Sequence, residues 1–158
     1  MKSAVIYYSR TGKTRYVAKE IEKMTDATDM EIKDLTNRSG ISAYISCAMD
    51  IFDNKITYIE PKHVDITDYD KIYIGTPVWG SNVAPAIFEI INRTDFRCKD
   101  VVTYVTFKGA GEIKALDILN NLVRQKGGNI IKSFAISSSD VNEFTFNTRR
   151  ALKNLENY

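Results

Sequence analysis

Residues 9–14 carry side chains of the kind that bind phosphate, placed directly after a short apolar run. They are Ser9, Arg10, Thr11, Gly12, Lys13 and Thr14. The first turn of a helix has about four unpaired backbone N–H groups and a partial positive charge. Hydroxyls and backbone donors together therefore suit a phosphate group. One hydroxyl is enough to cap a helix, so three hydroxyls with a glycine favour a phosphate-binding loop over a simple cap.

Three other phosphate-binding patterns are excluded by named residues. A P-loop needs a glycine five positions before Gly12, and Tyr7 occupies that position. The dinucleotide fingerprint GxGxxG is absent from the chain. A receiver domain needs acidic residues after its first and third strands, where residues 8–9 and 75–76 are uncharged.

The elements that must position this loop follow from the spacing of apolar residues. Short β-branched runs predict five strands, and stripes at helical spacing predict five helices that alternate with them. We expect strands over residues 5–8, 30–32, 72–76, 101–107 and 130–136. We expect helices over residues 13–24, 41–52, around 87–91, from 113 to a stop at 127–128, and over 141–155. The third helix is expected to begin at an N-cap, Ser81 or Asn82, with Pro85 inside its first turn.

Alternation of strand and helix predicts one α/β domain over residues 1–158, with a doubly wound parallel sheet and helices on both faces. In such sheets a ligand binds at the carboxyl ends of the strands, near the point where the winding reverses. The candidate site is therefore expected in a first loop (residues 9–14), a second loop (76–82) and a third loop (106–112).

Motifs in the first two loops resemble those of the flavodoxin family. SRTGKT at residues 9–14 resembles the phosphate loop of that family, [T/S]-x-T-G-x-T, and IGTPVWG at residues 74–80 resembles its second flavin loop. The resemblance spans the whole chain in element order and length. It implies a five-stranded sheet in the order 2-1-3-4-5 and a non-covalently bound FMN. The FMN phosphate would lie on the first loop and its ring between the second and third loops.

The same resemblance implies which residues of the second loop contact the flavin: Thr76, Pro77, Val78, Trp79 and Gly80. Trp79 is expected to stack on the ring, because a large flat indole suits a large flat ring. Glycine accepts either sign of φ, so a peptide beside Gly80 could flip and present a carbonyl to the N5–H of reduced flavin.

The third loop departs from the best-known flavodoxins, which usually place a tyrosine on the outer face of the flavin. Its expected binding residues are Thr106, Phe107, Lys108, Gly109 and Gly111, and no tyrosine is among them. Its glycines would let backbone N–H groups reach the pyrimidine edge of the ring and stabilise negative charge there. We expect one flavin face to be open.

The composition argues against a nucleic-acid-binding, membrane-spanning or metal-binding protein. The net charge is only +2, and no cluster of lysines and arginines with interleaved aromatic residues suggests nucleic-acid binding. No apolar stretch approaches the roughly 20 residues that span a bilayer. Cys47 and Cys98 have no CxxC partner, which is typical of reduced thiols, and His63 is the only histidine. We therefore expect a soluble cytoplasmic protein without a metal site.

Three functions remain open. The preferred one is an electron carrier, without catalytic side chains, that passes electrons between redox partner proteins. The second is an FMN-dependent oxidoreductase that reduces a quinone or similar small molecule with NAD(P)H, and the short third loop favours it. The third is a binding module that has lost FMN. No insertion walls a nicotinamide pocket, which favours the carrier, and we expect a monomer or weak dimer.

Overall fold

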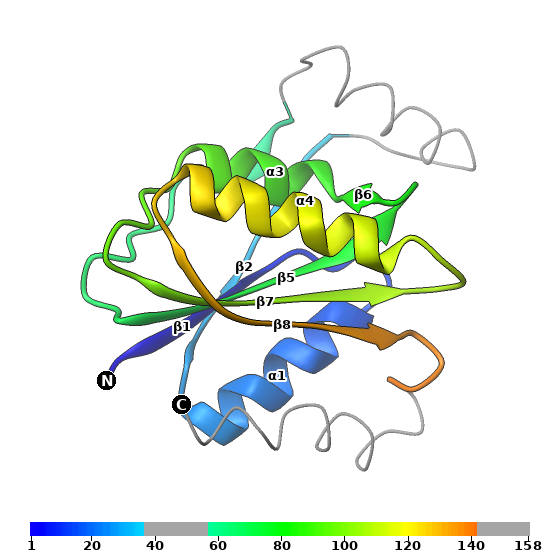
Figure 1. Cartoon of the computed structure of the whole chain (residues 1–158), viewed down its shortest axis with the longest axis horizontal. Helices are drawn as coiled ribbons and strands as arrows, with labels where there is room; N and C mark the ends of the chain where they lie inside the picture. Colours follow the sequence, from blue (N-terminus) through cyan, green and yellow to red (C-terminus); the bar gives the residue numbers. More distant parts are fainter. Residues whose placement is uncertain (37–56, 142–158) are drawn as a thin grey trace.

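A six-stranded sheet forms the centre of the protein (Figure 1). The computed structural model describes residues 1–36 and 57–141. Five strands follow the order β2-β1-β5-β7-β8, each parallel to its neighbours. They are β1 (Ser3–Tyr7), β2 (Thr28–Glu31), β5 (Lys71–Trp79), β7 (Asp100–Phe107) and β8 (Asn129–Ser137). This is the 2-1-3-4-5 order implied by the sequence resemblance, so the α/β fold prediction is confirmed.

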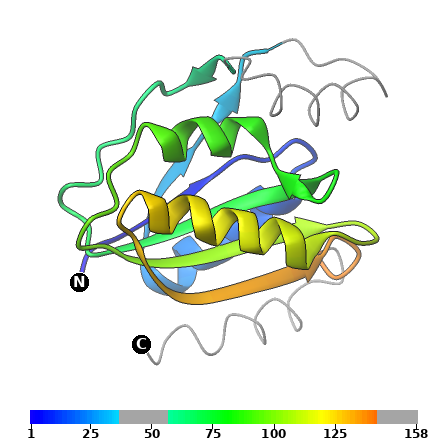
Figure 2. The ribbon, with the colours of Figure 1, turned by 45° about the horizontal axis from the view of Figure 1, so that its top comes forward.

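Helices cover both faces of this sheet (Figure 1, Figure 2). One face carries α1 (Lys13–Thr25), and the other carries α3 (Pro85–Asn92) and α4 (Glu112–Gln125). The helix expected over residues 41–52 lies outside the described residues, as does all but the first residue of the helix expected over 141–155.

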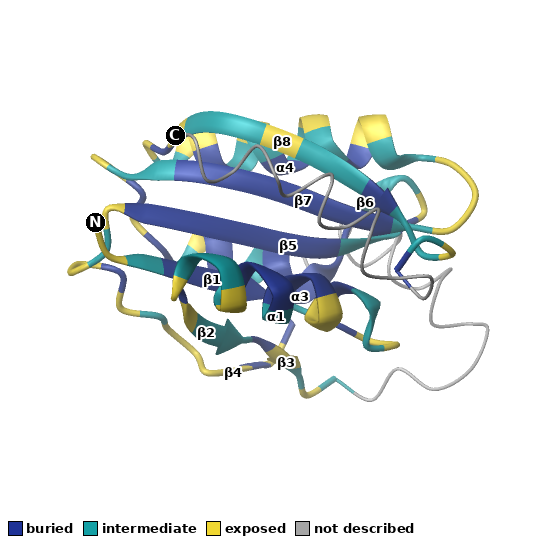
Figure 3. Cartoon of the chain, turned by 90° about the horizontal axis from the view of Figure 1, so that it is seen from below, coloured by how far each residue is buried: buried dark blue, intermediate teal, exposed yellow. Residues whose placement is uncertain are grey.

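Each face of the sheet has its own apolar core. On one face Ile74 packs with Ile87 of α3 and Leu119 of α4, and on the other Tyr73 packs with Ile21 of α1. Figure 3 shows β5 and β7 buried over most of their length. Strands covered on both faces read as continuous apolar runs rather than alternating ones. This explains why both strands were evident from the sequence.

The start of α3 differs from the sequence prediction. Its N-cap is Ala84, without a side-chain cap, so the prediction of Ser81 or Asn82 is wrong. Pro85 is the first helical residue, as expected. The physical reason is β6 (Asn82–Val83), which pairs antiparallel with β5. Because these two residues are in a strand, the helix can begin only after them.

A second sheet of two short strands was also not anticipated. It pairs β3 (Lys33–Asp34) with β4 (Ile59–Glu60) in antiparallel fashion. Strands of two residues are too short to show a period in the sequence. None of the described helices is long and apolar enough to cross a membrane.

Candidate functional site

Strand register brings the three expected loops to one edge of the sheet. Tyr7 at the end of β1 pairs with Gly75 of β5, which pairs in turn with Tyr104 of β7. Farther along, Pro77 pairs with Thr106. The loops that follow these three adjacent strands therefore leave the sheet at its carboxyl edge, where ligands bind in open parallel sheets.

The first loop ends in a helix terminus suited to an anion. Gly12 is the N-cap of α1 and has φ +88°, in the left-handed region that favours glycine. Its N–H donates to Ser9 Oγ at 3.1 Å, a bond that closes the loop. No side chain caps α1, and its first turn contains no acidic residue. The N–H groups and the positive end of α1 therefore suit a phosphate.

Two of the expected binding hydroxyls, those of Thr14 and Thr106, bond to each other. Their Oγ1 atoms lie 2.8 Å apart, and both residues are buried. The Tyr104 hydroxyl also donates to the Thr14 carbonyl, at 3.3 Å. These bonds fix the first turn of α1 on β7. Within the first loop, Thr11 is left as the exposed hydroxyl.

Most of the expected second loop is strand. Residues 77–79 belong to β5, and Trp79 pairs with Asn82 of β6 across a two-residue turn. Gly80 and Ser81 in this turn have φ values of 55° and 62°, and two successive positive φ values are typical of a tight hairpin. The expectation of a loop over residues 76–82 is therefore wrong, because β6 prolongs the pairing of β5.

Thr76 is fully buried and joins two elements. Its hydroxyl donates to the Pro77 carbonyl at 3.0 Å and accepts the N–H of Ala84, also at 3.0 Å. These bonds connect β5 to the start of α3. Thr76 therefore positions the hairpin and does not present a hydroxyl to the surface.

Trp79 lies beside the first loop. Its indole makes an edge-to-face contact with Tyr8, with ring centroids 5.6 Å apart and an interplanar angle of 87°, and it packs with Ala84. The guanidinium carbon of Arg10 lies over the indole, 5.6 Å from the ring centroid. The residue is 5% exposed. The side chain expected to stack on a flavin thus has an arginine of the first loop over it.

The third loop closely approaches the hairpin turn. Gly111 is the N-cap of α4 with φ +101°, and a Cβ added to it would lie 2.5 Å from Ser81 Oγ and 2.9 Å from Ser81 Cα. Only glycine permits this approach. Phe107 ends β7 and is half-buried, whereas Lys108 and Gly109 are exposed.

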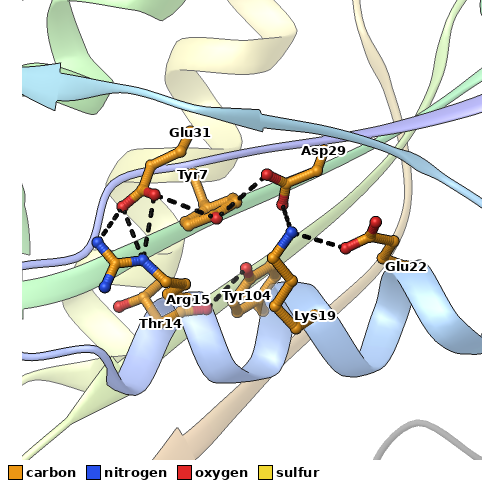
Figure 4. Close-up of polar contacts among 8 residues, drawn as sticks. All are labelled: Tyr7, Thr14, Arg15, Lys19, Glu22, Asp29, Glu31 and Tyr104. Carbon is orange, nitrogen blue, oxygen red and sulfur yellow. Dashed lines mark hydrogen bonds and ion pairs between the residues drawn. The ribbon is translucent and has the colours of Figure 1, made fainter.

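A polar network that sequence reasoning missed holds α1 against β2 (Figure 4). Arg15 donates to both carboxylate oxygens of Glu31, at 2.6 Å from Nη2 to Oε1 and at 3.0 and 3.1 Å from Nε. Lys19 pairs with Asp29 at 3.2 Å, and the Tyr7 hydroxyl lies 3.5 Å from both carboxylates. The sequence does carry a signal for this pairing. Acidic residues two positions apart share one face of a strand, and cationic residues four positions apart share one face of a helix. The network holds the first turn of α1, and thus the first loop, in place.

Three buried tyrosines lie beneath α1, and their ionisation is expected to destabilise the fold at alkaline pH. Burial, and then the carboxylates of Asp29 and Glu31, raise the pKa of Tyr7 above its ordinary value of 10.0. Burial also raises the pKa values of Tyr73 and Tyr104. Because the folded-state pKa exceeds the unfolded one, this stabilisation is complete below about pH 10 and is lost as pH rises toward the folded-state pKa.

We therefore predict that the free energy of unfolding falls above about pH 10. It should fall less steeply in Tyr7→Phe, which lacks one ionisable hydroxyl. Denaturant unfolding at a series of alkaline pH values measures both slopes. Identical slopes in the two proteins would contradict the prediction.

A shallow hollow of about 520 Å³ lies away from this edge, lined by residues of the ranges 92–97 and 124–127. It includes four cationic side chains, those of Arg93, Arg97, Arg124 and Lys126. Two of the arginines already pair with carboxylates. Both α3 and α4 end here, and helix C-termini carry a partial negative charge. The N-terminus of α1 is therefore the better phosphate site.

Comparison with known protein families decides how the chain is classified. A family model described as Flavodoxin matches residues 2–148. The chain belongs to the flavodoxin family. This assignment confirms the resemblance carried by residues 9–14 and 74–80, and it supports FMN as the cofactor. Among curated protein sequences, none matches this flavodoxin-family chain.

Solved structures similar to this flavodoxin-family chain include a flavoprotein in complex with FMN from Lactobacillus acidophilus. It has 23% identity and a TM-score of 0.73, covering 90% of this chain and 97% of that one. A protein from Bacteroides uniformis described as a flavoprotein has 24% identity and a TM-score of 0.78, and the match covers 96% of this chain and 97% of that one. An NADH:FMN oxidoreductase in its apo form has 14% identity and a TM-score of 0.65, and the match covers 98% of this chain and 86% of that one. These likenesses show the shared fold.

Proposed function

We propose that the chain binds FMN non-covalently and carries electrons between redox partner proteins. The observation that carries this proposal is the N-terminus of α1, which has no side-chain cap and no acid in its first turn. Trp79 lies beside the loop that leads into it. A phosphate-binding helix end next to a large aromatic ring suits a ligand that joins a phosphate to a flat ring system, as FMN does. Family membership and the fold shared with the FMN complex support the same ligand.

The phosphate is proposed to bind the first loop through Ser9, Arg10, Thr11, Gly12, Lys13 and Thr14. Ser9 keeps the loop closed through its bond from the Gly12 N–H. Thr14 contributes its backbone N–H, since its hydroxyl is bonded to Thr106. The exposed hydroxyl of Thr11 adds a side-chain donor.

The ring is proposed to lie between the hairpin and the third loop. The residues proposed around it are Thr76, Pro77, Val78, Trp79, Gly80, Thr106, Phe107, Lys108, Gly109 and Gly111. Trp79 stacks on the ring, and the backbone of Gly109 and Gly111 orients its pyrimidine edge. The flavin, when bound, supplies the redox chemistry, while the chain supplies orientation and electrostatics.

One observation favours a second function, an FMN-dependent oxidoreductase that uses NAD(P)H to reduce a quinone or similar molecule. The third loop has no tyrosine, and residues 108–110 are exposed. An enzyme of this kind needs an open flavin face that a nicotinamide or an acceptor can approach. The carrier remains the preferred function because, among the described residues, the loops after β1, β5 and β7 are short and build no wall for a nicotinamide.

Mixing the FMN-loaded chain with NADPH and a quinone distinguishes the two functions. We predict that the absorbance of the oxidised flavin persists, because a carrier has no nicotinamide site. Flavin reduction followed by rapid turnover would contradict the carrier and favour the oxidoreductase. A purified chain that stays colourless after FMN is added would exclude both functions.

A further inference from the structure

The third loop and the start of α4 form an exposed surface beside the proposed position of the flavin ring. Figures 1 and 2 show this loop reaching past the end of the sheet, next to the turn between β5 and β6. Gly111 closely approaches Ser81 of that turn, which places the loop there. Four exposed residues make up what we call the third-loop surface: Lys108, Ala110, Ile113 and Lys114.

Ile113 is an apolar side chain left in water at this surface. It is 73% exposed, more than any other large apolar side chain of the described residues except Met1. Single exposed apolar residues are common on proteins. This one, however, has lysines before and after it in the chain and lies at the edge where the flavin is proposed to bind. An apolar contact with a polar rim is typical of an interface between proteins.

The charge of this edge is mainly positive. Residues 8–16, 80–88 and 108–115, which follow β1, β5 and β7, include a single acid, Glu112, and these cations: Arg10, Lys13, Arg15, Lys108 and Lys114. Arg15 pairs with Glu31, and the other two cations of the first loop lie in the proposed phosphate site. Glu112 is in the first turn of α4, where the partial positive charge of the helix end offsets it.

The two lysines of the third-loop surface are therefore the cations that a partner would meet. Lys108 and Lys114 pair with no carboxylate of the described residues, Asp117 on the next turn of α4 included. Opposite charges on two proteins steer their encounter and raise the association rate by about 10-fold to 1,000-fold at low salt. An apolar contact, by contrast, is not screened by salt and slows dissociation.

We propose that the third-loop surface docks an acidic redox partner protein. Carboxylates of the partner meet Lys108 and Lys114, and an apolar side chain of the partner covers Ile113. The lysines speed the encounter, and Ile113 holds the partner beside the flavin while an electron passes. This inference rests on the proposed electron-carrier function and adds to it the charge of the partner and the residues that dock it.

Electron transfer from the reduced, FMN-loaded chain to two c-type cytochromes, one acidic and one basic, tests the charge of the partner. One electron passes from the flavin to the haem iron, which goes from Fe(III) to Fe(II). Stopped-flow haem absorbance gives the bimolecular rate constant. Raising the ionic strength from about 0.01 M to about 0.15 M shortens the Debye length from about 30 Å to about 8 Å. Over this range the constant for the acidic cytochrome should fall about tenfold, and that for the basic one should not fall.

Two matched charge reversals test the place of docking. Lys114→Glu changes the third-loop surface and lies outside the proposed flavin contacts. Lys62→Glu is the control, an exposed lysine at the opposite edge of the sheet, where its carbonyl accepts a bond from Arg93. At low ionic strength Lys114→Glu should slow transfer to the acidic cytochrome about threefold to tenfold and speed transfer to the basic one. Lys62→Glu should leave both rate constants nearly unchanged.

Ile113→Ser tests the apolar contact. It should slow transfer to the acidic cytochrome about fivefold even at high ionic strength, because salt does not screen this contact. Gel filtration of the FMN-loaded chain tests a different occupant of the surface. A dimer that dissociates in Ile113→Ser would assign the surface to a second copy of the chain and overturn the docking proposal.

The outcomes separate this inference from the proposed function. Faster transfer to the basic cytochrome, rate constants that do not depend on salt, or equal effects of Lys114→Glu and Lys62→Glu would each overturn the docking proposal and leave the electron carrier intact. A chain that holds FMN but reduces neither cytochrome would contradict the carrier itself, and the docking proposal would fail with it.

Discussion

Replacing Trp79 by alanine is expected to lower both the free energy of unfolding and the affinity for FMN. The indole is 5% exposed and packs against Tyr8 and Ala84, so its removal leaves a cavity. Truncating a buried tryptophan costs about 3–5 kcal/mol, and we expect about 3 kcal/mol at this edge of the core. Loss of ring stacking, about 0.5–1.5 kcal/mol, should weaken FMN binding by up to about tenfold. Denaturant unfolding and a flavin titration measure the two effects.

Trp79→Phe is the matched control, because it keeps an aromatic ring in the same place. Both losses should be smaller than in Trp79→Ala. The two measurements separate a structural role from a binding role. A Trp79→Ala variant that is less stable but binds FMN as tightly as the wild type would show that the indole only fills the core.

Gly75→Ala is expected to destabilise the sheet strongly. An added Cβ would lie 2.0 Å from Cζ and 2.3 Å from Oη of Tyr104. The Tyr104 ring is fully buried and stacks on Phe134, with centroids 5.6 Å apart, so it has no space to move aside. Overpacking costs about 1–3 kcal/mol, and we expect a loss near the upper end of that range. The free energy of unfolding in urea measures it.

Gly109→Ala provides the comparison for backbone strain alone. Unlike Gly75, Gly109 has a positive φ, of 89°, and a Cβ added there would meet nothing within 4 Å. We expect Gly109→Ala to lower the free energy of unfolding by about 1 kcal/mol. The double variant Gly75→Ala/Tyr104→Ala should lose less stability than the sum of its single variants, because the clash is gone. Strictly additive losses would contradict the proposed clash.

The parts of the fold that the sequence predicted well are those buried on both faces. Residues 72–76 and 101–107 read as unbroken apolar runs because helices cover β5 and β7 from both sides. Elements defined by pairing were missed. β6 exists because residues 82–83 pair back onto the end of β5, and this pairing in turn sets where α3 begins. A single domain, a cytoplasmic location and a monomer or weak dimer stay predictions.

In the candidate site, too, features set by neighbouring residues could be predicted from the sequence, and contacts between distant residues could not. The composition of residues 9–14 was enough to predict a phosphate loop before a helix. The bond between Thr14 and Thr106 joins positions 92 residues apart, and no local pattern indicates it. Likewise, Arg10 lies over Trp79 only because β5 extends far enough to place the indole beside the first loop.

Binding of the FMN phosphate at the N-terminus of α1 is tested most directly by amide NMR of the full chain during an FMN titration. Each backbone N–H reports its own surroundings, so the spectrum locates the ligand residue by residue. We predict the largest shifts at residues 10–14, with further shifts at 79–81 and 108–111 and none at 124–127. Unchanged amides at residues 10–14, or shifts confined to the distant hollow, would contradict phosphate binding at this helix end.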